Sequence, residues 1–311
     1  MLASGTAFCY WVVMNAESRP DSVVFKYRGR DLTTGDIAFV NQTVERHYSQ
    51  GRSYIALQLC EAWQWRQPNG QFKAYAARDL LLRLEENGFV RLPARKRTKI
   101  NGKAKSFDQI PLFVKKPLSG PVGRFAQPVI CSLSGPDTRL WDYLIHHYHY
   151  LGLPTLVGEH LKQVAVIDGQ IVACLGWASA AWKIAARDTY IGWDPALRRK
   201  NLYLLANNVR FLIPEWVRIE HLASKVLASS LAGLSRQWQS RYGHRLALVE
   251  TFVDNARFKG TCYRAANWIY AGQTAGSAKK GNAWHHHGQP KAVYLYPLHR
   301  NFRRLLCHDP R

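Results

Sequence analysis

The sequence predicts an α+β protein with two domains, a small helical domain followed by a larger domain in which helices flank a mixed β-sheet. Three observations carry this prediction. The chain has 311 residues, which suits about two domains. Apolar residues recur at helical spacing over residues 30–93. From residue 127 onward, short apolar runs typical of strands alternate with helical patterns.

The first region is expected to contain three helices. Thr33 and Asp36 form a capping box that starts the first helix. Apolar residues four apart predict a second helix from Ser53 and a third over residues 72–84. A short strand is expected at residues 89–92. Helix, helix, turn, helix and short strand is the order of a winged-helix or helix-turn-helix unit.

The third of these helices has a polar face opposite its apolar stripe. Gln and Arg can contact base edges in a major groove, and a small Ala lets the helix approach closely. The residues expected to contact nucleic acid here are Gln71, Lys73, Tyr75 and Arg78. A solvated helix face would explain the same pattern.

A basic segment follows this helix at residues 91–105 and contains no acidic residue. Such a segment suits phosphate contacts, which give salt-dependent affinity and little choice of sequence. The candidate phosphate-binding residues are Arg95, Lys96, Arg97 and Lys99. A solvated basic linker is the alternative. The helix and the basic segment together predict that the partner is a nucleic acid, and duplex DNA is the first candidate.

The overall charge favours the same partner. The chain has 43 Lys or Arg and 21 Asp or Glu residues, a net charge of +22. The usual partner of such a surplus is a polyanion. No apolar run approaches the roughly 20 residues that span a bilayer, so no membrane insertion is expected. The six cysteines contain no close pair, which favours a reducing cytosol.

The expected divisions are an N-terminal arm at 1–27, the winged-helix domain at 28–93, a basic linker at 94–126 and the larger domain at 127–311. The arm has an apolar stretch but no basic residue before Arg19, so it does not match a secretory signal. Met1 and Met14 remain alternative natural starts.

The elements expected in the larger domain are strands at 128–133, 163–167, 171–177, 202–213, 246–253 and 292–296, with helices at 137–150, 222–241 and 261–267. Asp168 and Gly169, between two of these strands, are a strong hairpin signal. The resulting order, β-α-β-β-β-α-β-α-β, resembles the GNAT N-acetyltransferase fold.

The GNAT resemblance implies a catalytic residue and a cofactor. GNAT proteins commonly carry a Tyr on the helix at 261–267, followed by a Gly-aromatic pair four and five residues on; here Tyr263 precedes Asn267 and Trp268. The resemblance implies Tyr263 as a general acid and acetyl-CoA as the cofactor. A core tyrosine is the alternative. The family's glycine-rich phosphate loop has no counterpart here, and Glu220 would repel a phosphate at that place.

A second resemblance covers residues 28 to 306. Six stretches are similar to the signature of the DruA family: RGRDL at 28–32, YHYLG at 148–152, RDTYIGW at 187–193, NNVRFLIP at 207–214, ETFVD at 250–254 and GTCYRAANWI at 260–269. The family is named after a component of the Druantia anti-phage system. The resemblance implies a role in defence against phage or mobile DNA, and it supplies no known reaction.

Several carboxylates could do chemistry. Glu250 and Asp254 lie four apart across the end of a buried strand and share a face, so both could reach one pocket. An ion pair of Glu250 with Arg210 or Arg264 is the structural alternative. With Asp188, the two carboxylates could instead hold magnesium for phosphodiester cleavage.

Polar residues also predict a pocket. Asn207 and Asn208 point to opposite faces of a strand, so one must face the core or a cleft and needs hydrogen-bond partners. Arg210 is expected beside them. His149 is a further catalytic candidate at a helix end, where histidines more often cap and stack than bind metal. We assign no residue to a metal site from the sequence, and the cofactor stays open between acetyl-CoA and magnesium.

The sequence therefore predicts a cytosolic DNA-binding component of phage defence, whose larger domain acts on or senses the bound nucleic acid. One alternative is an acyl-CoA-dependent transferase that modifies a base, with Tyr263 as acid and Glu250 as base. The other is a transposase-like protein or nuclease of a mobile element. Other defence proteins are expected partners.

Overall fold

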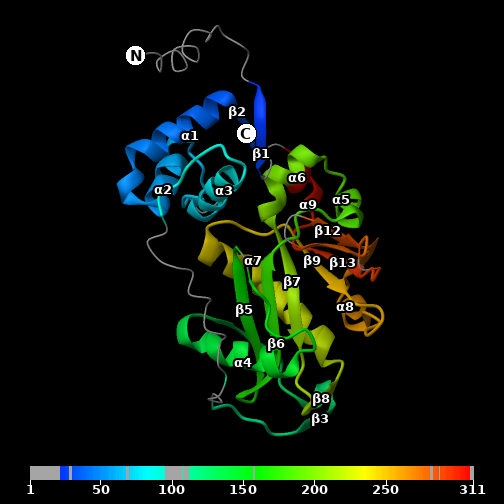
Figure 1. The fold of residues 1–311 in the computed structure, drawn as a ribbon. Helices are drawn as coiled ribbons and strands as arrows, with labels where there is room; N and C mark the ends of the chain where they lie inside the picture. The colour runs from blue at the N-terminus through cyan, green and yellow to red at the C-terminus, as the bar shows by residue number, and fades with distance from the viewer. Residues whose placement is uncertain are drawn as a thin grey trace, which may run out of the picture. The chain divides into compact units, whose positions relative to one another are not determined.

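The structure, a computed structural model, describes residues 22–27, 30–67, 70–94, 107, 112–156, 158–280, 283–286 and 288–308. The chain divides into two compact units, Met1–Gly102 and Lys103–Arg311 (Figure 1). Across the described ranges, every helix is too short or too polar to span a membrane.

The smaller unit has three helices after a β-hairpin. Its elements are β1 (Val23–Tyr27), β2 (Arg30–Thr33), α1 (Thr34–Arg46), the 3-10 turn η1 (Tyr48–Gln50), α2 (Arg52–Ala62) and α3 (Ala74–Glu86). The predicted capping box is confirmed, since the Thr33 hydroxyl accepts from the Asp36 amide and the Asp36 carboxylate accepts from the Thr33 amide. The three predicted helices are confirmed, and Leu59, Leu80 and Leu84 lie in their shared core.

The strand predicted at residues 89–92 is wrong. Its backbone bonds to α3 and to side chains and not to a neighbouring strand: the Phe89 amide donates to the Leu84 carbonyl (2.9 Å), Asn41 Nδ2 donates to the Phe89 carbonyl (3.0 Å) and the Leu92 amide donates to Glu85 (3.2 Å). The hairpin of this unit precedes α1, and a long connection, residues 63–73, separates α2 from α3.

The larger unit is built on a seven-stranded mixed sheet. Its strands are β4 (Val129–Leu133), β5 (His160–Ile167), β6 (Gln170–Ser179), β7 (Leu205–Leu212), β9 (Leu248–Val253), β10 (Ile269–Gln273) and β13 (Ala292–Pro297). Their order in the sheet is β10-β13-β9-β7-β6-β5-β4. Only β7 and β9 are parallel neighbours; the other pairs are antiparallel.

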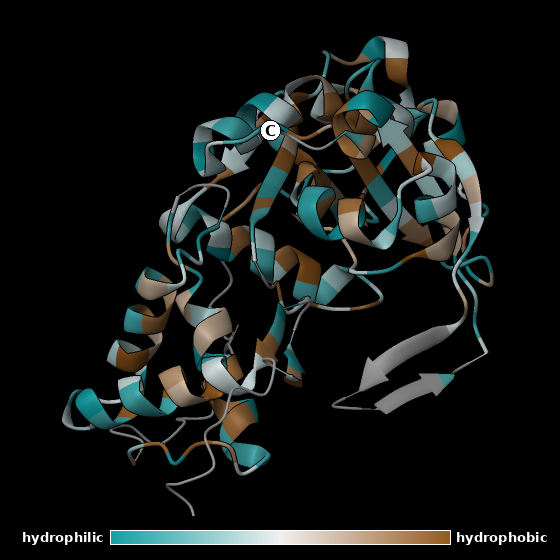
Figure 2. Ribbon diagram, turned by 90° about the horizontal axis from the view of Figure 1, so that it is seen from above, coloured by the Kyte–Doolittle hydropathy of each residue, from teal (hydrophilic) through white to brown (hydrophobic). Residues whose placement is uncertain are grey.

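Two helices cover opposite faces of this sheet, α4 (Thr138–Tyr148) and α7 (Leu222–Tyr242). Gln163 of β5 contacts Gln237 and Ser230 of α7. The next residue, Lys162, contacts Asp142 of α4. Successive strand residues point to opposite faces, so β5 and β6 are sandwiched between the helices. In Figure 2, where hydrophobic residues are brown, several strands and helices carry hydrophobic segments next to hydrophilic ones.

The remaining elements of the larger unit are β3 (Leu118–Pro121), η2 (Val122–Arg124), η3 (Gly135–Asp137), α5 (Ala185–Ile191), α6 (Pro195–Asn201), η4 (Leu202–Leu204), β8 (Val217–Glu220), α8 (Thr261–Ala265), β11 (Ser277–Lys280), β12 (Ala283–His286) and α9 (Phe302–Cys307). β3 lies inside the predicted linker and pairs in parallel with β8. All the strands and helices predicted for this domain are present, and Asp168 and Gly169 form the predicted hairpin turn with φ of 49° and 77°.

Candidate functional site

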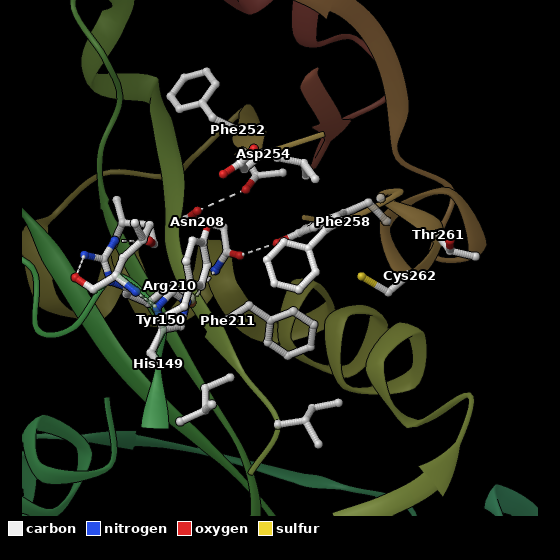
Figure 3. A pocket seen from close by; sticks show the side chains of 18 of the residues that line it. His149, Tyr150, Asn208, Arg210, Phe211, Phe252, Asp254, Phe258, Thr261 and Cys262 are labelled. Carbon is white, nitrogen blue, oxygen red and sulfur yellow. Dashed lines mark hydrogen bonds between the residues drawn. The ribbon is translucent and has the colours of Figure 1, made fainter. Parts of the chain in front are cut away.

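A cavity opens where the parallel strands β7 and β9 part. They pair at Leu205 with Leu248, Ala206 with Val249 and Asn207 with Glu250, and at no later position. Beyond Asn207 the space between them is a cavity of about 560 Å³ (Figure 3). The side chains and backbone that line it belong to residues 148–151, 208–213, 251–254 and 258–263.

The β7 wall of the cavity contains a β-bulge. Trp177 of β6 pairs with Asn208, and the preceding Gly176 pairs with Arg210, so Val209 is an extra residue on β7. A bulge leaves one residue outside the ladder and bends its strand, and bulges are frequent beside functional sites. Here the bulge lies where β7 has lost β9 as a neighbour on its other edge.

Asn208 and Tyr263 form the floor of the cavity. The Tyr263 hydroxyl donates to Asn208 Oδ1 (3.0 Å), and Asn208 Nδ2 donates to the Gly176 and Arg210 carbonyls (3.2 Å each). Burial raises the pKa of Tyr263 far above its ordinary value, so the phenol is protonated at neutral pH. The floor thus presents a fixed, neutral hydrogen-bonding pair.

His149, directly after α4, is a neutral wall residue. Burial, with a smaller effect of the Arg210 charge, lowers the pKa of His149 to about 4. Its Nδ1 accepts from the Leu151 amide (3.1 Å), so the neutral ring carries its proton on Nε2. At pH 7 His149 can donate a hydrogen bond, and it is too weakly basic to be an efficient general base.

Arg210 supplies positive charge to the same wall. Its guanidinium donates to the carbonyls of Gly152 (2.9 Å) and Val209 (2.7 Å), which fix its position. In Figure 3 it lies beside Tyr150 and His149, across the cavity from Cys262.

Two aromatic rings form an exposed rim. Tyr150 is 42% exposed and Phe258 is 50% exposed, and their ring centroids are 5.3 Å apart. His149 stacks on Tyr150 with centroids 4.9 Å apart, and Arg257 lies 5.0 Å from the centre of the Tyr150 ring. Half-exposed aromatic rings at a cavity mouth are available to stack on a planar ligand.

The structure separates the two carboxylates that were expected to converge. Asp254 lines the cavity and accepts from the Ala256 amide (3.1 Å). Glu250 does not line it. Glu250 is fully buried, receives a hydrogen bond from the Ala181 amide (2.8 Å) and pairs with Arg187 (2.8 Å). Its ion-pair partner is therefore Arg187, and neither of the two arginines that the sequence suggested.

Asp188 belongs to the same buried network as Glu250. It pairs with Arg187 (2.7 Å) and Arg198 (3.0 Å). Burial raises the pKa of Glu250, and Arg187 opposes this rise. Within the described ranges, no group of three His, Cys, Asp or Glu side chains is placed to hold a metal ion. The proposed magnesium site of Asp188, Glu250 and Asp254 is therefore not assembled.

The predicted nucleic-acid residues of the smaller unit fall into two sets. Gln71, Tyr75 and Arg78 are exposed at the start of α3, and Tyr75 is 67% exposed. Lys73 is half-buried, and burial lowers its pKa. The remaining set, Arg95, Lys96, Arg97 and Lys99, lies outside the described residues.

Sequence reasoning placed Asn208, Arg210, Tyr263, Asp254 and His149 at sites, and all five line one cavity. Asn207 does not line it; its side-chain oxygen is buried without a hydrogen-bond partner. Among the lining residues that sequence reasoning missed are Tyr150, Phe211, Thr251, Phe252, Phe258 and Cys262. Of these six, all but Phe258 lie inside the stretches that resemble the DruA signature, and that resemblance is the signal that could have found them.

Comparison with known proteins identifies one family and several similar solved structures. The family model described as Druantia protein DruA matches residues 83–283. No curated protein matches the sequence.

Similar solved structures include an aminoglycoside acetyltransferase, AAC(6')-Ib, in complex with coenzyme A, with 10% identity, a TM-score of 0.35 and coverage of 57% of this chain and 97% of that one. An N-acetyltransferase from Staphylococcus aureus Mu50 has 10% identity, a TM-score of 0.34 and coverage of 56% and 99%. The ribosomal-protein-S18-alanine N-acetyltransferase from Escherichia coli has 11% identity, a TM-score of 0.33 and coverage of 55% and 94%.

Proposed function

The chain belongs to the DruA family, and from this premise we propose that it is a nucleic-acid-binding protein of phage defence whose cavity between β7 and β9 receives a nucleobase. The proposal places it in the cytosol, where invading DNA is met. Its net charge of +22 supports a polyanionic partner.

The observation that carries the proposal is the combination of groups around the cavity. Tyr150 and Phe258 form an exposed aromatic rim. Below them, the Nε2 proton of neutral His149, the Arg210 charge and the Asn208–Tyr263 pair offer hydrogen bonds at fixed positions. Flat rings for stacking and polar groups for an edge are what a pocket needs to hold an unstacked base.

The volume of the cavity agrees with this use. A cavity of about 560 Å³ falls within the range of small-molecule sites, roughly 300–1,000 Å³. A base must leave its stack to enter, and this costs least in a single strand. We therefore expect single-stranded DNA to reach the cavity more readily than a duplex.

The rim residues provide the test. In a titration of the full chain with a fluorescently labelled single-stranded oligonucleotide, Tyr150→Leu and Phe258→Leu should each weaken binding about tenfold, since stacking on one aromatic ring is worth about 1–3 kcal/mol. Tyr270→Leu is the matched control, because Tyr270 is 52% exposed in the same unit and does not line the cavity. An equal loss in all three variants would contradict the proposal.

The smaller unit offers a separate duplex-binding surface. Gln71, Tyr75 and Arg78 are exposed at the start of α3, and the basic segment 91–105 follows this helix in the sequence. Because these three side chains are exposed, they support the proposal that α3 contacts duplex DNA as the recognition helix of a winged-helix domain does. The triple change Gln71→Ala, Tyr75→Ala and Arg78→Ala should weaken duplex binding and leave the response to rim changes intact.

Acyl transfer is the second candidate function, and one observation favours it. Protonated Tyr263 lies at the floor of a cavity between two diverging parallel strands, where it could return a proton to a leaving thiolate. β8 lies directly before α7 and ends at the exposed Glu220, whose negative charge would repel a diphosphate at the start of α7. A rise in melting temperature with millimolar acetyl-CoA would support this candidate, and no rise would remove it.

A further inference from the structure

Most of the net positive charge belongs to the larger unit. Residues 103–311 contain 28 Lys or Arg and 12 Asp or Glu, a net charge of +16. Residues 1–102 contain 15 and 9, a net charge of +6. The larger unit is therefore basic in its own right, and its exposed cations can be searched for a polyanion-binding surface apart from α3.

Helices α5, α6 and α9 form one platform in this unit. Asn201 at the end of α6 donates to the Leu306 carbonyl of α9 (2.9 Å). Arg303 of α9 donates to the Tyr190 carbonyl of α5 (3.1 Å), and the Tyr190 and Phe302 rings stack. Phe302 and Leu306 are buried beneath. Tertiary hydrogen bonds and a shared core thus fix these short helices together.

The platform is strongly basic. Its exposed basic residues, within 180–201 and 298–308, are Lys183, Arg199, Lys200, Arg300, Arg303 and Arg304. The one exposed acidic residue in those two ranges is Asp194, which caps α6. Arg187 and Arg198 are inside the ion-pair network with Asp188, so they do not add to the exposed charge.

An aromatic ring stands beside these charges. Trp182 is 50% exposed, precedes α5 and adjoins Lys183 in the chain. The Arg198 guanidinium lies 5.9 Å from the centre of its ring. A half-exposed indole next to a basic platform is the arrangement that binds single-stranded nucleic acid, where bases stack on rings and cations follow the backbone.

We propose that the surface of α5, α6 and α9, with Trp182 at its edge, binds the backbone of single-stranded DNA and stacks one base on Trp182. The proposal rests on the proposed nucleic-acid function, but it uses a different place. α6 leads into the start of β7, whereas the cavity begins beyond Asn207, toward the end of that strand. The surface would hold the strand while another nucleotide enters the cavity.

Salt dependence tests the charged part of the proposal. The full chain is titrated with a labelled oligo-dT over a series of salt concentrations, as wild type and as the triple variant Arg199→Ala, Lys200→Ala, Arg304→Ala. Each lost phosphate contact reduces the slope of log affinity against log salt by about 0.7 for a single strand, so the triple variant should lose about 2. Its affinity at low salt should fall at least tenfold.

The matched control removes the same charge from elsewhere in the larger unit. Arg218→Ala, Arg236→Ala and Arg241→Ala change three exposed arginines on β8 and α7. This variant should keep the wild-type slope. Equal slopes for the two triple variants would overturn the proposal, because binding would then depend on diffuse charge.

Trp182 tests the stacking part. Trp182→Ala should lower the affinity at every salt concentration with an unchanged slope, and Trp182→Phe should restore most of the loss. No loss of oligo-dT affinity in Trp182→Ala, or an equal loss of oligo-dT and duplex affinity in that variant, would overturn the single-strand assignment.

The rim variants separate this surface from the cavity. If Tyr150→Leu loses affinity and the triple variant Arg199→Ala, Lys200→Ala, Arg304→Ala does not, the proposed surface on α5, α6 and α9 is wrong and the proposed base site in the cavity stands. If only the triple variant loses affinity, the surface binds the strand as proposed and the proposal that the cavity receives a base is wrong.

Discussion

Arg187 and Glu250 form a fully enclosed ion pair, with both side chains completely buried. Removing one partner of such a pair leaves an uncompensated charge and costs about 3–5 kcal/mol. Glu250→Ala should therefore lower the free energy of unfolding by about that amount in a urea titration. Glu215→Ala, which removes an exposed carboxylate, should change it by less than about 0.5 kcal/mol. Equal effects would show that the pair does not stabilise the fold.

His149 gives a pH prediction with a defined sign. Its folded-state pKa of about 4 lies below the ordinary value of 6.5, so the unfolded chain binds the proton more tightly. His149 should therefore lower stability progressively as the pH falls from about 6.5 to about 4. His149→Gln should show a smaller loss over this window, measured by urea unfolding at a series of pH values. An identical pH profile in the variant would contradict the assignment of a neutral His149.

Residue types alone suggested which side chains belong to a functional site, but they could not identify which side chains contact one another. Asn208, Arg210 and Tyr263 were expected at a site from their residue types and sequence context, and they line the cavity. The partner of Glu250 was not predictable, because Arg187 is 63 residues away and reaches it only through the fold. A buried acid requires a partner, but nothing in the sequence selects one arginine among many.

At the level of elements, α8 depends on a glycine. Gly260 begins this helix with φ of 66°, and a Cβ there would lie 2.6 Å from the Tyr294 hydroxyl oxygen and 2.8 Å from a ring carbon. Gly192, with φ of 84°, has nothing within 4 Å of its Cβ position. Both positions disfavour Ala, but only Gly260 adds a steric clash.

Gly260→Ala should consequently lower the free energy of unfolding by about 2 kcal/mol or more in thermal or urea unfolding, which is more than the loss in Gly192→Ala. It should also weaken oligonucleotide binding, because α8 carries Tyr263 to the cavity floor. Gly192→Ala should lose only about 1 kcal/mol and bind normally. The same destabilisation in both variants would mean that Tyr294 moves aside freely.

The long, strongly patterned elements were predictable from the sequence. β5, β6, β9, α4 and α7 all lie within a few residues of their expected ranges. The short helices α5 and α6, of seven residues each, gave too few repeats of the helical period to be recognised. The strand expected at 89–92 failed because its apolar residues are buried in a helical core, where side-chain hydrogen bonds replace a ladder.

At the level of the whole molecule, both units are basic, with net charges of +6 and +16. From the net charge the sequence predicts a polyanionic partner, and its pattern directs attention to the basic segment 91–105. The fold gathers a further exposed group of cations on α5, α6 and α9, from stretches about 100 residues apart in the chain. Only the tertiary structure brings those stretches together.

The central claim is that the cavity between β7 and β9 takes a base of bound DNA. Photocrosslinking of the full chain to a single-stranded oligonucleotide containing 5-bromouracil, followed by mass spectrometry of the crosslinked peptides, tests it most directly. We expect crosslinks within residues 148–151 or 258–263, and their loss in Tyr150→Leu. Efficient crosslinking confined to other residues, unchanged in that variant, would contradict the claim.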